Sequence, residues 1–366
     1  MVFNWPTDTV RFFGDKNSVG IRKPIDKKSN YVKRCVGLPG DKLEIKNGDL
    51  FINGKIENLP ERAKTQYSYF AEFEGSNNIN ENELFELNTY RSDKFQRYEN
   101  NVVFPAITNE SLEKLKTMKG LKLLKKNIDT THTIFSYVFK LDPNQNNPEI
   151  ENIVEKLRQN RVNATIRKED NLLFVDYVPM DIVNYIKSQK SVVGFKENYE
   201  IFPHGPQQKN WTKDNLGPIN IPQAGKTVEL NTETLPFYKR IIKEYEGNDL
   251  KLNGNEIRIN GQVATSYTFK QDYYWMMGDN RHNSEDSRYW GYVPADHIVG
   301  KPVFIWMSLD QNEPWGKLFD KVRWERMFTT VGGSGKPVSY FIYFVIALVA
   351  WFGFDYFRKK RKKSAE

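Results

Sequence analysis

The sequence predicts a mostly β body that is interrupted by an α+β insertion and followed by a C-terminal transmembrane helix. Three observations predict this fold class. Short alternating runs separated by Asn-Gly and Gly/Pro turns lie on both sides of a central region. That central region carries helix-spaced Leu, Ile and Val among Lys and Glu. An apolar run of 20 residues, Val338 to Phe357, lies near the C-terminus.

Residues 1–58 form the first part of the predicted β body. The chain opens with a strand-like run, Met1 to Pro6. No charged and apolar leader precedes it, so we expect that an upstream segment belongs to the natural protein. Three further strands form a predicted meander because turn residues such as Asn47-Gly48 separate them: Tyr31 to Val36, Lys42 to Ile45 and Asp49 to Ile52.

Residues 59–200 form the predicted α+β insertion, in which helical and strand patterns alternate. Helical spacing predicts three helices, at Asn109 to Ile128, Asn147 to Asn160 and Met180 to Ser188. Strand-like runs lie between them at Thr133 to Leu141, Ala164 to Arg167 and Leu172 to Val178.

Residues 201–330 form the second part of the predicted β body. A helix is expected at Thr234 to Tyr245. The β pattern then returns at Tyr267 to Met277, Tyr292-Val293 and Pro302 to Leu309.

Residues 338–357 form the predicted transmembrane helix, and residues 358–366 a basic tail. As a helix the run would be about 30 Å long, the thickness of a bilayer's hydrocarbon core. The basic run Arg358 to Lys363 follows directly and places this end in the cytoplasm. The body would then lie outside the cytoplasm. The alternative is a buried helix of a soluble domain.

The charge and the metal-binding residue types exclude two classes of partner. The net charge is 54 − 46 = +8, but six of these charges lie in the basic tail, which leaves 48 − 46 = +2 for the rest of the chain. That value predicts no nucleic-acid partner. Cys35 is the sole cysteine, and the four histidines have no metal-ligand spacing. We therefore expect no metal and no cofactor.

The loop from Gly278 to Gly291 contains the densest polar chemistry of the chain. Its carboxylates and guanidiniums are flanked by Trp275 and Trp290, which predicts that they are partly buried and paired. A structural ion-pair network and a direct catalytic role both remain open. Asp279 and Asp286 could also be read as the two acids of a glycosidase, although nothing in the sequence fixes their separation.

Three sequence blocks together resemble bacterial type I signal peptidase, a membrane-bound Ser/Lys endopeptidase that removes signal peptides. The blocks are Tyr31 to Asp41 (YVKRCVGLPGD), the Gly278 to Gly291 loop with its continuation Tyr292-Val293-Pro294, and Ile305 to Ser308. The resemblance covers roughly residues 1–55 and 200–330. It implies exported preproteins as substrates, membrane lipid as a partner, and the bacterial cytoplasmic (inner) membrane as the location.

The resemblance implies that Lys33 is the general base that activates a serine hydroxyl. This role requires a lysine pKa well below the usual value of about 10.4, which burial provides. Side chains alternate along a strand, so Lys33 and Arg34 point apart. The alternative for Lys33 is a surface lysine. Cys35 as a reactive nucleophile is a further alternative, although no histidine accompanies it.

The resemblance also implies supporting roles. Ser284 would bind and orient the Lys33 amine, and Asp279 would pair with Arg34. Asp286 and Arg288 would pair to hold the loop, and Gly278 would leave room beside the site. The sequence departs from the family pattern at His282 and Glu285, positions that vary among family members.

The nucleophile block of the family, Ser-Met-x-Pro, is absent, since no Ser-Met dipeptide occurs in the chain. We therefore expect the nucleophile upstream, and expect this chain alone to cleave nothing. The alternative function is a catalytically inactive, membrane-anchored β-rich protein that acts in binding or assembly.

Overall fold

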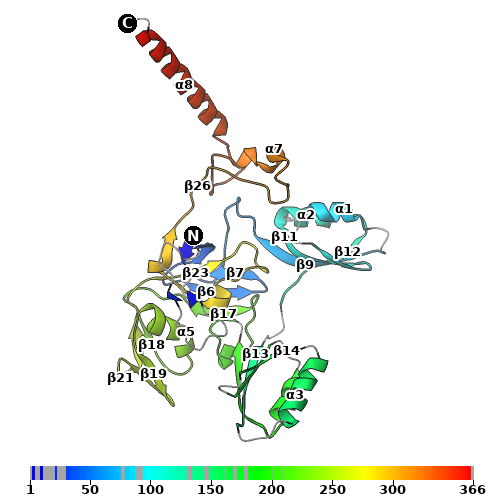
Figure 1. Cartoon of the computed structure of the whole chain (residues 1–366), viewed down its shortest axis with the longest axis vertical. Helices are drawn as coiled ribbons and strands as arrows, with labels where there is room; N and C mark the ends of the chain where they lie inside the picture. Colours follow the sequence, from blue (N-terminus) through cyan, green and yellow to red (C-terminus); the bar gives the residue numbers. More distant parts are fainter. Residues whose placement is uncertain are drawn as a thin grey trace.

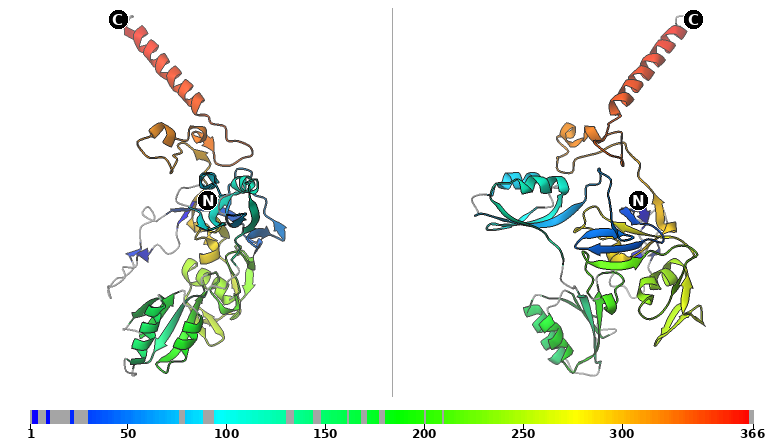
Figure 2. Two further views of the ribbon diagram at one scale, coloured as in Figure 1. Left: turned by 90° about the vertical axis from the view of Figure 1, so that its right-hand side faces the viewer. Right: turned by 180° about the vertical axis from the view of Figure 1, so that it is seen from behind.

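The structure is a computed structural model of the 366-residue chain. It describes residues 2–4, 9–10, 21–22, 30–75, 79–87, 94–129, 134–143, 148–160, 162–167, 171–176, 180–199, 201–208 and 210–363. A central β body has one α+β unit beside it and a second α+β unit at the end away from a long helix, α8, which projects from the C-terminal end of the molecule (Figures 1 and 2). Met1, Trp5 and Pro6 of the predicted opening strand lie outside the described residues.

The β body consists of small antiparallel sheets built from both parts of the chain. One sheet contains β1 (Val2–Asn4), β4 (Asn30–Val32) and β25 (Ile298–Gly300). A second contains β5 (Arg34–Gly37), β23 (Tyr273–Met277) and β24 (Val293–Pro294). A third contains β6 (Lys42–Lys46), β7 (Asp49–Ile52), β8 (Lys55–Ile56) and β17 (Leu216–Asn220). Residues before 58 thus pair with residues after 215.

The predicted hairpin meander is confirmed for Lys42 to Ile45 and Asp49 to Ile52, which pair as β6 and β7, but it is wrong for Tyr31 to Val36, whose second half, β5, lies in another sheet beside β23. Lys46 pairs with Asp49 and leaves a two-residue loop, Asn47-Gly48. Both loop residues have positive φ, 51° and 78°, which is the type I′ geometry that suits the twist of an antiparallel pair. Asn and Gly tolerate this backbone conformation better than other residues do.

Smaller elements complete the body. Its remaining strands are β2 (Thr9–Val10), β3 (Ile21–Arg22), β18 (Thr227–Glu229), β19 (Leu250–Asn253), β20 (Glu256–Ile259), β21 (Gln262–Val263), β22 (Ser266–Thr268), β26 (Phe304–Ile305) and β27 (Thr329–Thr330). Its helices are η3 (Pro206–Gln208), α5 (Leu235–Arg240), η4 (Ile241–Tyr245), α6 (Ser287–Trp290), η5 (Ala295–His297), α7 (Leu318–Lys321) and η6 (Trp324–Arg326). The predicted helix at 234–245 is confirmed as α5 and η4. The strands predicted at 267–277 and 302–309 are shorter and broken.

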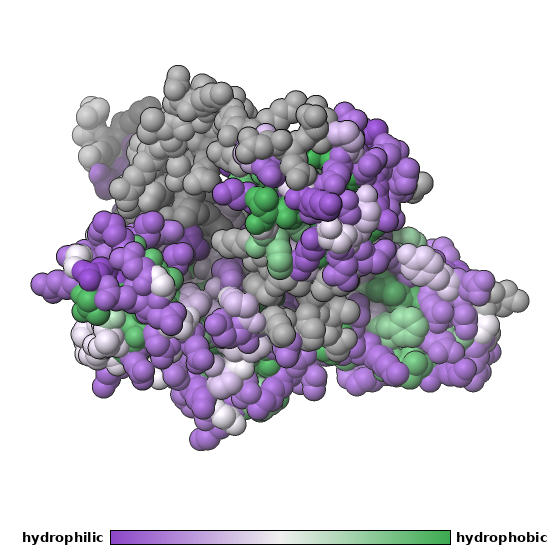
Figure 3. Space-filling view, turned by 90° about the horizontal axis from the view of Figure 1, so that it is seen from below, coloured by the Kyte–Doolittle hydropathy of each residue, from purple (hydrophilic) through white to green (hydrophobic). Residues whose placement is uncertain are grey.

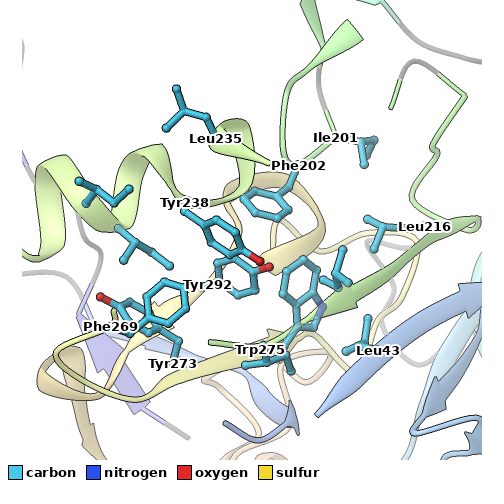
Figure 4. Packing of buried hydrophobic residues seen from close by; sticks show 14 of the residues in the cluster. Leu43, Ile201, Phe202, Leu216, Leu235, Tyr238, Phe269, Tyr273, Trp275 and Tyr292 are labelled. Carbon is cyan, nitrogen blue, oxygen red and sulfur yellow. The ribbon is translucent and has the colours of Figure 1, made fainter. Parts of the chain in front are cut away.

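The core of the body is rich in aromatic side chains. Trp275 and Tyr292 are buried, and each packs edge-on against Phe202 with ring centroids 5.7 and 5.1 Å away. Figure 4 shows these rings turned toward one another, with Leu43 and Leu216 beside them. The core therefore joins β6 and β17 to β23, the strand that leads into the Gly278–Gly291 loop.

Residues 59–200 contain both helices and strands, and these form two units of the same topology. The first has β9 (Gln66–Phe73), α1 (Glu81–Leu87), β10 (Gln96–Tyr98), β11 (Asn101–Thr108), α2 (Asn109–Lys116) and β12 (Leu121–Lys126). The second has β13 (Ile134–Leu141), α3 (Pro148–Gln159), β14 (Asn163–Arg167), β15 (Leu172–Asp176), α4 (Met180–Lys187) and β16 (Val192–Tyr199). In both βαββαβ units the strands lie in the order 2-3-1-4, the ferredoxin-like arrangement.

One predicted helix is wrong in its second half. The helix predicted over 109–128 ends at Lys116, and Leu121–Lys126 forms strand β12 against β9. Gly120, with φ of 78°, lies between them. A left-handed backbone at this position is incompatible with a continuous helix. Pairing with β9 therefore decides the conformation of a segment whose spacing is helical.

Helix α8 (Phe341–Lys363) begins three residues after the predicted start and continues through the basic run. Its segment Phe341–Arg361 is long and apolar enough to cross a membrane, and none of it is buried against the body. The alternative of a buried helix is therefore wrong. Residues 364–366 of the predicted tail lie outside the described residues.

Candidate active site

Lys33 lies at the break between β4 and β5, where the predicted strand 31–36 divides in two. Its Nζ lies 2.6 Å from Ser284 Oγ, the hydrogen bond that the resemblance implies. Burial lowers the pKa of Lys33, while the Asp286 carboxylate opposes part of that effect. A half-buried lysine that is held by a hydroxyl and loses its proton more readily is chemically suited to act as a base.

Gly278 is required for this contact. A Cβ at this position would lie 2.0 Å from Ser284 Oγ and 3.5 Å from Lys33 Nζ. Heavy atoms do not approach to 2.0 Å without bonding, so any side chain here would displace Ser284. The room beside the site that the resemblance implies for Gly278 is present.

The side chain of Arg34 binds a different partner from the one that Lys33 binds. Its Nε and one terminal nitrogen donate to the two carboxylate oxygens of Asp279 at 2.7 and 2.8 Å. This is the bidentate geometry that a guanidinium and a carboxylate favour. The pair is only partly buried, because the side chains of Arg34 and Asp279 are 27% and 41% exposed.

Asp286 and Arg288 form a second bidentate pair, which is fully buried. Asp286 also caps the short helix α6 and accepts a hydrogen bond from the Gly278 N–H at 3.1 Å. Arg288 donates to the main-chain oxygen of Arg281 at 2.6 Å. The pair therefore holds both ends of the segment that carries Ser284.

The other interpretations of these residues fit the structure less well. The carboxylates of Asp279 and Asp286 are both engaged by arginine, which suits structural ion pairs better than the two acids of a glycosidase. Burial raises the pKa of Cys35, which keeps it a thiol. Among the described residues, no group of three or more His, Cys, Asp or Glu side chains is placed to hold a metal ion.

Sequence reasoning did not find the contacts of His282. Its ring accepts a hydrogen bond from the Ser68 N–H at Nδ1 and bonds Asp214 Oδ1 from Nε2, both at 2.8 Å. The only sequence signal is that a histidine stands at a position where the family pattern varies. Its partners lie 214 and 68 residues away in the chain, so no local pattern indicates them.

Comparison with known proteins identifies the family of the chain. The family model described as "Signal peptidase, peptidase S26" matches residues 2–95 and 216–307, about half of the chain. The chain belongs to this signal peptidase family. The matched segments include Lys33, Arg34 and the whole Gly278–Gly291 loop.

Individual signal peptidases are similar over shorter stretches. Signal peptidase I of Helicobacter pylori (strain ATCC 700392 / 26695) is 32% identical over 133 residues, which is 34% of this chain and 44% of that protein. Signal peptidase I of Buchnera aphidicola subsp. Acyrthosiphon pisum is 68% identical over 89 residues, 23% of this chain and 28% of that protein. The Haemophilus influenzae enzyme is 39% identical over 112 residues, 30% of each chain. The chain thus spans less than half the length of these relatives.

Proposed function

We propose that this signal peptidase family member is a membrane-bound serine endopeptidase that removes signal peptides from exported preproteins. The observation that carries the proposal is the 2.6 Å contact between Lys33 Nζ and Ser284 Oγ, at a lysine whose pKa is lowered by burial. A lysine can take a proton from a serine hydroxyl only as the free amine, and a lowered pKa increases the fraction in that form.

The proposed reaction is acyl transfer through a Ser/Lys dyad. The Lys33 amine removes the proton of a serine hydroxyl, and the serine oxygen attacks the carbonyl carbon of the scissile peptide bond. The resulting Lys33 ammonium gives its proton to the leaving amine. Water, activated by the same amine, then hydrolyses the acyl-enzyme. We place the serine in a Ser-Met-x-Pro block upstream of these residues, since no such block occurs within them.

The remaining site residues act in support. Ser284 orients the amine, and Gly278 leaves the space in which the two groups meet. The pairs Arg34–Asp279 and Asp286–Arg288 fix the strand and the loop that carry them. We also propose that the two βαββαβ units form an insertion in the catalytic body, between residues 1–58 and 201–330.

Membrane anchoring is part of the proposal, with α8 as the anchor. Exposed aromatic side chains lie around β26 and α7, in the part of the chain next to α8 (Figure 1): Phe304, Trp306, Trp315, Phe319 and Trp324. Aromatic rings of this kind suit the bilayer interface. The described surface at the end of the molecule opposite α8 is mostly hydrophilic (Figure 3). A reporter fused after Glu366 should be cytoplasmic, and one within the second βαββαβ unit extracytoplasmic; both on one side would contradict the anchor.

An inactive binding or assembly protein is the second candidate function. It would retain the fold and the ion pairs, but it would have no need of a half-buried lysine with a lowered pKa. The full-length protein incubated with a preprotein distinguishes the two. Cleavage after small residues that is unaffected by chelators supports the peptidase, because the proposed dyad uses no metal. Binding without cleavage supports the alternative.

A further inference from the structure

The first βαββαβ unit contacts the Gly278–Gly291 loop directly through its first strand, β9. The Gln66 N–H donates to the main-chain oxygen of Asp279 at 2.8 Å, and the Arg281 N–H donates to the main-chain oxygen of Gln66 at 2.9 Å. Gln66 thereby forms a β-bridge with Asn280. The beginning of β9 therefore extends the catalytic loop by main-chain pairing.

His282, which precedes Ser284 by two residues, also contacts β9. Its Nδ1 accepts a hydrogen bond from the Ser68 N–H at 2.8 Å. A main-chain N–H can only donate, so Nδ1 carries no proton and the Nε2–H donates to Asp214. The ring is 5% exposed and Asp214 is 1% exposed. Both ring nitrogens are therefore used in a buried setting.

Asp214 links His282 to the residues where the chain leaves each unit. Its second oxygen accepts a hydrogen bond from the Asp129 N–H at 2.8 Å, and Thr212 Oγ1 donates to the Asp129 main-chain oxygen at 2.8 Å. Burial raises the pKa of Asp214, but the hydrogen bonds from His282 and the Asp129 N–H outweigh it and the pKa lies below its usual value. An ionised carboxylate is thus retained as acceptor.

These contacts join three chain segments at one histidine. Ser68 lies at the start of the first unit, Asp129 follows its end, and Asp214 follows the second unit. The Asn127 N–H donates to the Ser68 main-chain oxygen at 2.9 Å and closes the group. His282 is therefore held by residues that lie at the ends of the two units, and Ser284 follows His282 by two residues.

We propose that His282 is a positioning residue for the signal peptidase reaction. It links the residues at the ends of the two βαββαβ units to the catalytic loop, so that Ser284 Oγ keeps its hydrogen bond with Lys33 Nζ. This inference rests on the proposed function. It gives the two units a role in catalysis although neither supplies a reacting group. A shift of about 1 Å at a site of this kind can cost about 100-fold in rate.

The test uses the full-length protein with a preprotein substrate, and it compares His282→Ala with His282→Asn and His297→Ala. We expect His282→Ala to lower kcat by about 10- to 100-fold with KM changed by less than about 2-fold. The Asn Oδ1 can still accept from the Ser68 N–H, so His282→Asn should recover part of kcat. His297 also bonds an aspartate, Asp296, at 2.8 Å, and its ring packs against Tyr245 of η4, outside the two units, which makes His297→Ala a matched control with wild-type kcat.

Amide hydrogen exchange in the same variants separates the outcomes. In His282→Ala the amides of Ser68 and of residues 283–285 should exchange faster than in wild type, whereas His297→Ala should leave them unchanged. A His282→Ala protein that keeps wild-type kcat, or whose residues 283–285 keep wild-type exchange, would overturn the proposal. Wild-type protein that cleaves nothing would contradict the proposed function instead, and exchange at 283–285 would then decide the coupling alone.

Discussion

The carboxylate of Asp286 and the guanidinium of Arg288 form two hydrogen bonds, of 2.8 and 2.7 Å, with both side chains at most 1% exposed. The other arginine–aspartate pair described at the site is more open to water, since the side chains of Arg34 and Asp279 are 27% and 41% exposed. Two pairs of the same chemistry therefore stabilise the site in different dielectric surroundings.

This difference predicts unequal costs for removing the two carboxylates. Asp286→Ala leaves the Arg288 charge buried without its partner and should lower the free energy of unfolding by about 3–5 kcal/mol. Asp279→Ala leaves Arg34 with access to water and should cost about 1 kcal/mol. Urea unfolding measures both. Equal losses would show that burial does not govern these pairs.

Gly278→Ala tests the space between β23 and the catalytic loop. The new methyl would lie 2.0 Å from Ser284 Oγ, so Ser284 must move away from Lys33. We expect a stability cost of about 1–3 kcal/mol and a loss in kcat of about 100-fold. Gly300→Ala is the matched control, because nothing lies within 4 Å of its Cβ position. Similar kinetics for the two variants would contradict the close approach.

Glu285 gives a prediction for pH dependence. Burial lowers the pKa of Lys33, and the carboxylates of Asp286 and Glu285 raise it. Removing the Glu285 charge should therefore lower the Lys33 pKa further and keep the free amine down to lower pH. In Glu285→Gln, the acid limb of the pH profile of kcat/KM should therefore shift to lower pH. Glu233→Gln, an exposed residue outside the loop, should leave the profile unchanged. A shift to higher pH would reverse the assigned sign.

The same pKa has a consequence for folding. Because the folded-state pKa of Lys33 is lowered, the unfolded chain binds more protons between that value and about 10.4, and this residue's contribution to stability rises with pH through that window. Lys33→Met should remove that contribution.

Arg62 fastens the segment that precedes α8. Its guanidinium donates to the main-chain oxygens of Gly332, Ser334, Gly335 and Lys336 at 2.9–3.1 Å, and Glu61 accepts from the Gly335 N–H. Arg62→Ala should speed amide exchange at Gly335, and Arg62→Lys should not restore protection, since an ammonium cannot span these acceptors. Arg97→Ala, which removes a surface ion pair with Glu81, is the control. Unchanged exchange would show that Arg62 does not fasten the segment.

The divergence of Lys33 and Arg34 could be predicted from the sequence because side chains alternate along a strand, and the structure places them on Ser284 and Asp279. The Asn47-Gly48 hairpin could be predicted because so few residues accept its backbone. In each case the cause lies within a few residues of the feature. Features with such local causes can be predicted before the fold is known.

The contacts of His282 and the duplication of the βαββαβ unit could not be predicted in this way. The Ser68 N–H is a main-chain group that carries no residue signature, and it meets His282 across 214 positions. Strand β12 has helical spacing, and its pairing with β9 decides its conformation. Tertiary pairing thus determines the features that sequence periodicity leaves open.

The central claim is that Lys33 acts as the general base, and Lys33→Arg in the full-length protein tests it most directly. The guanidinium keeps a positive charge but cannot accept a proton near neutral pH. Cleavage of a preprotein should therefore fall by several orders of magnitude, to the level of Lys33→Ala. Lys42→Ala, at an exposed lysine of the β6–β7 hairpin, should retain wild-type cleavage. Substantial cleavage by Lys33→Arg would contradict the Ser/Lys mechanism.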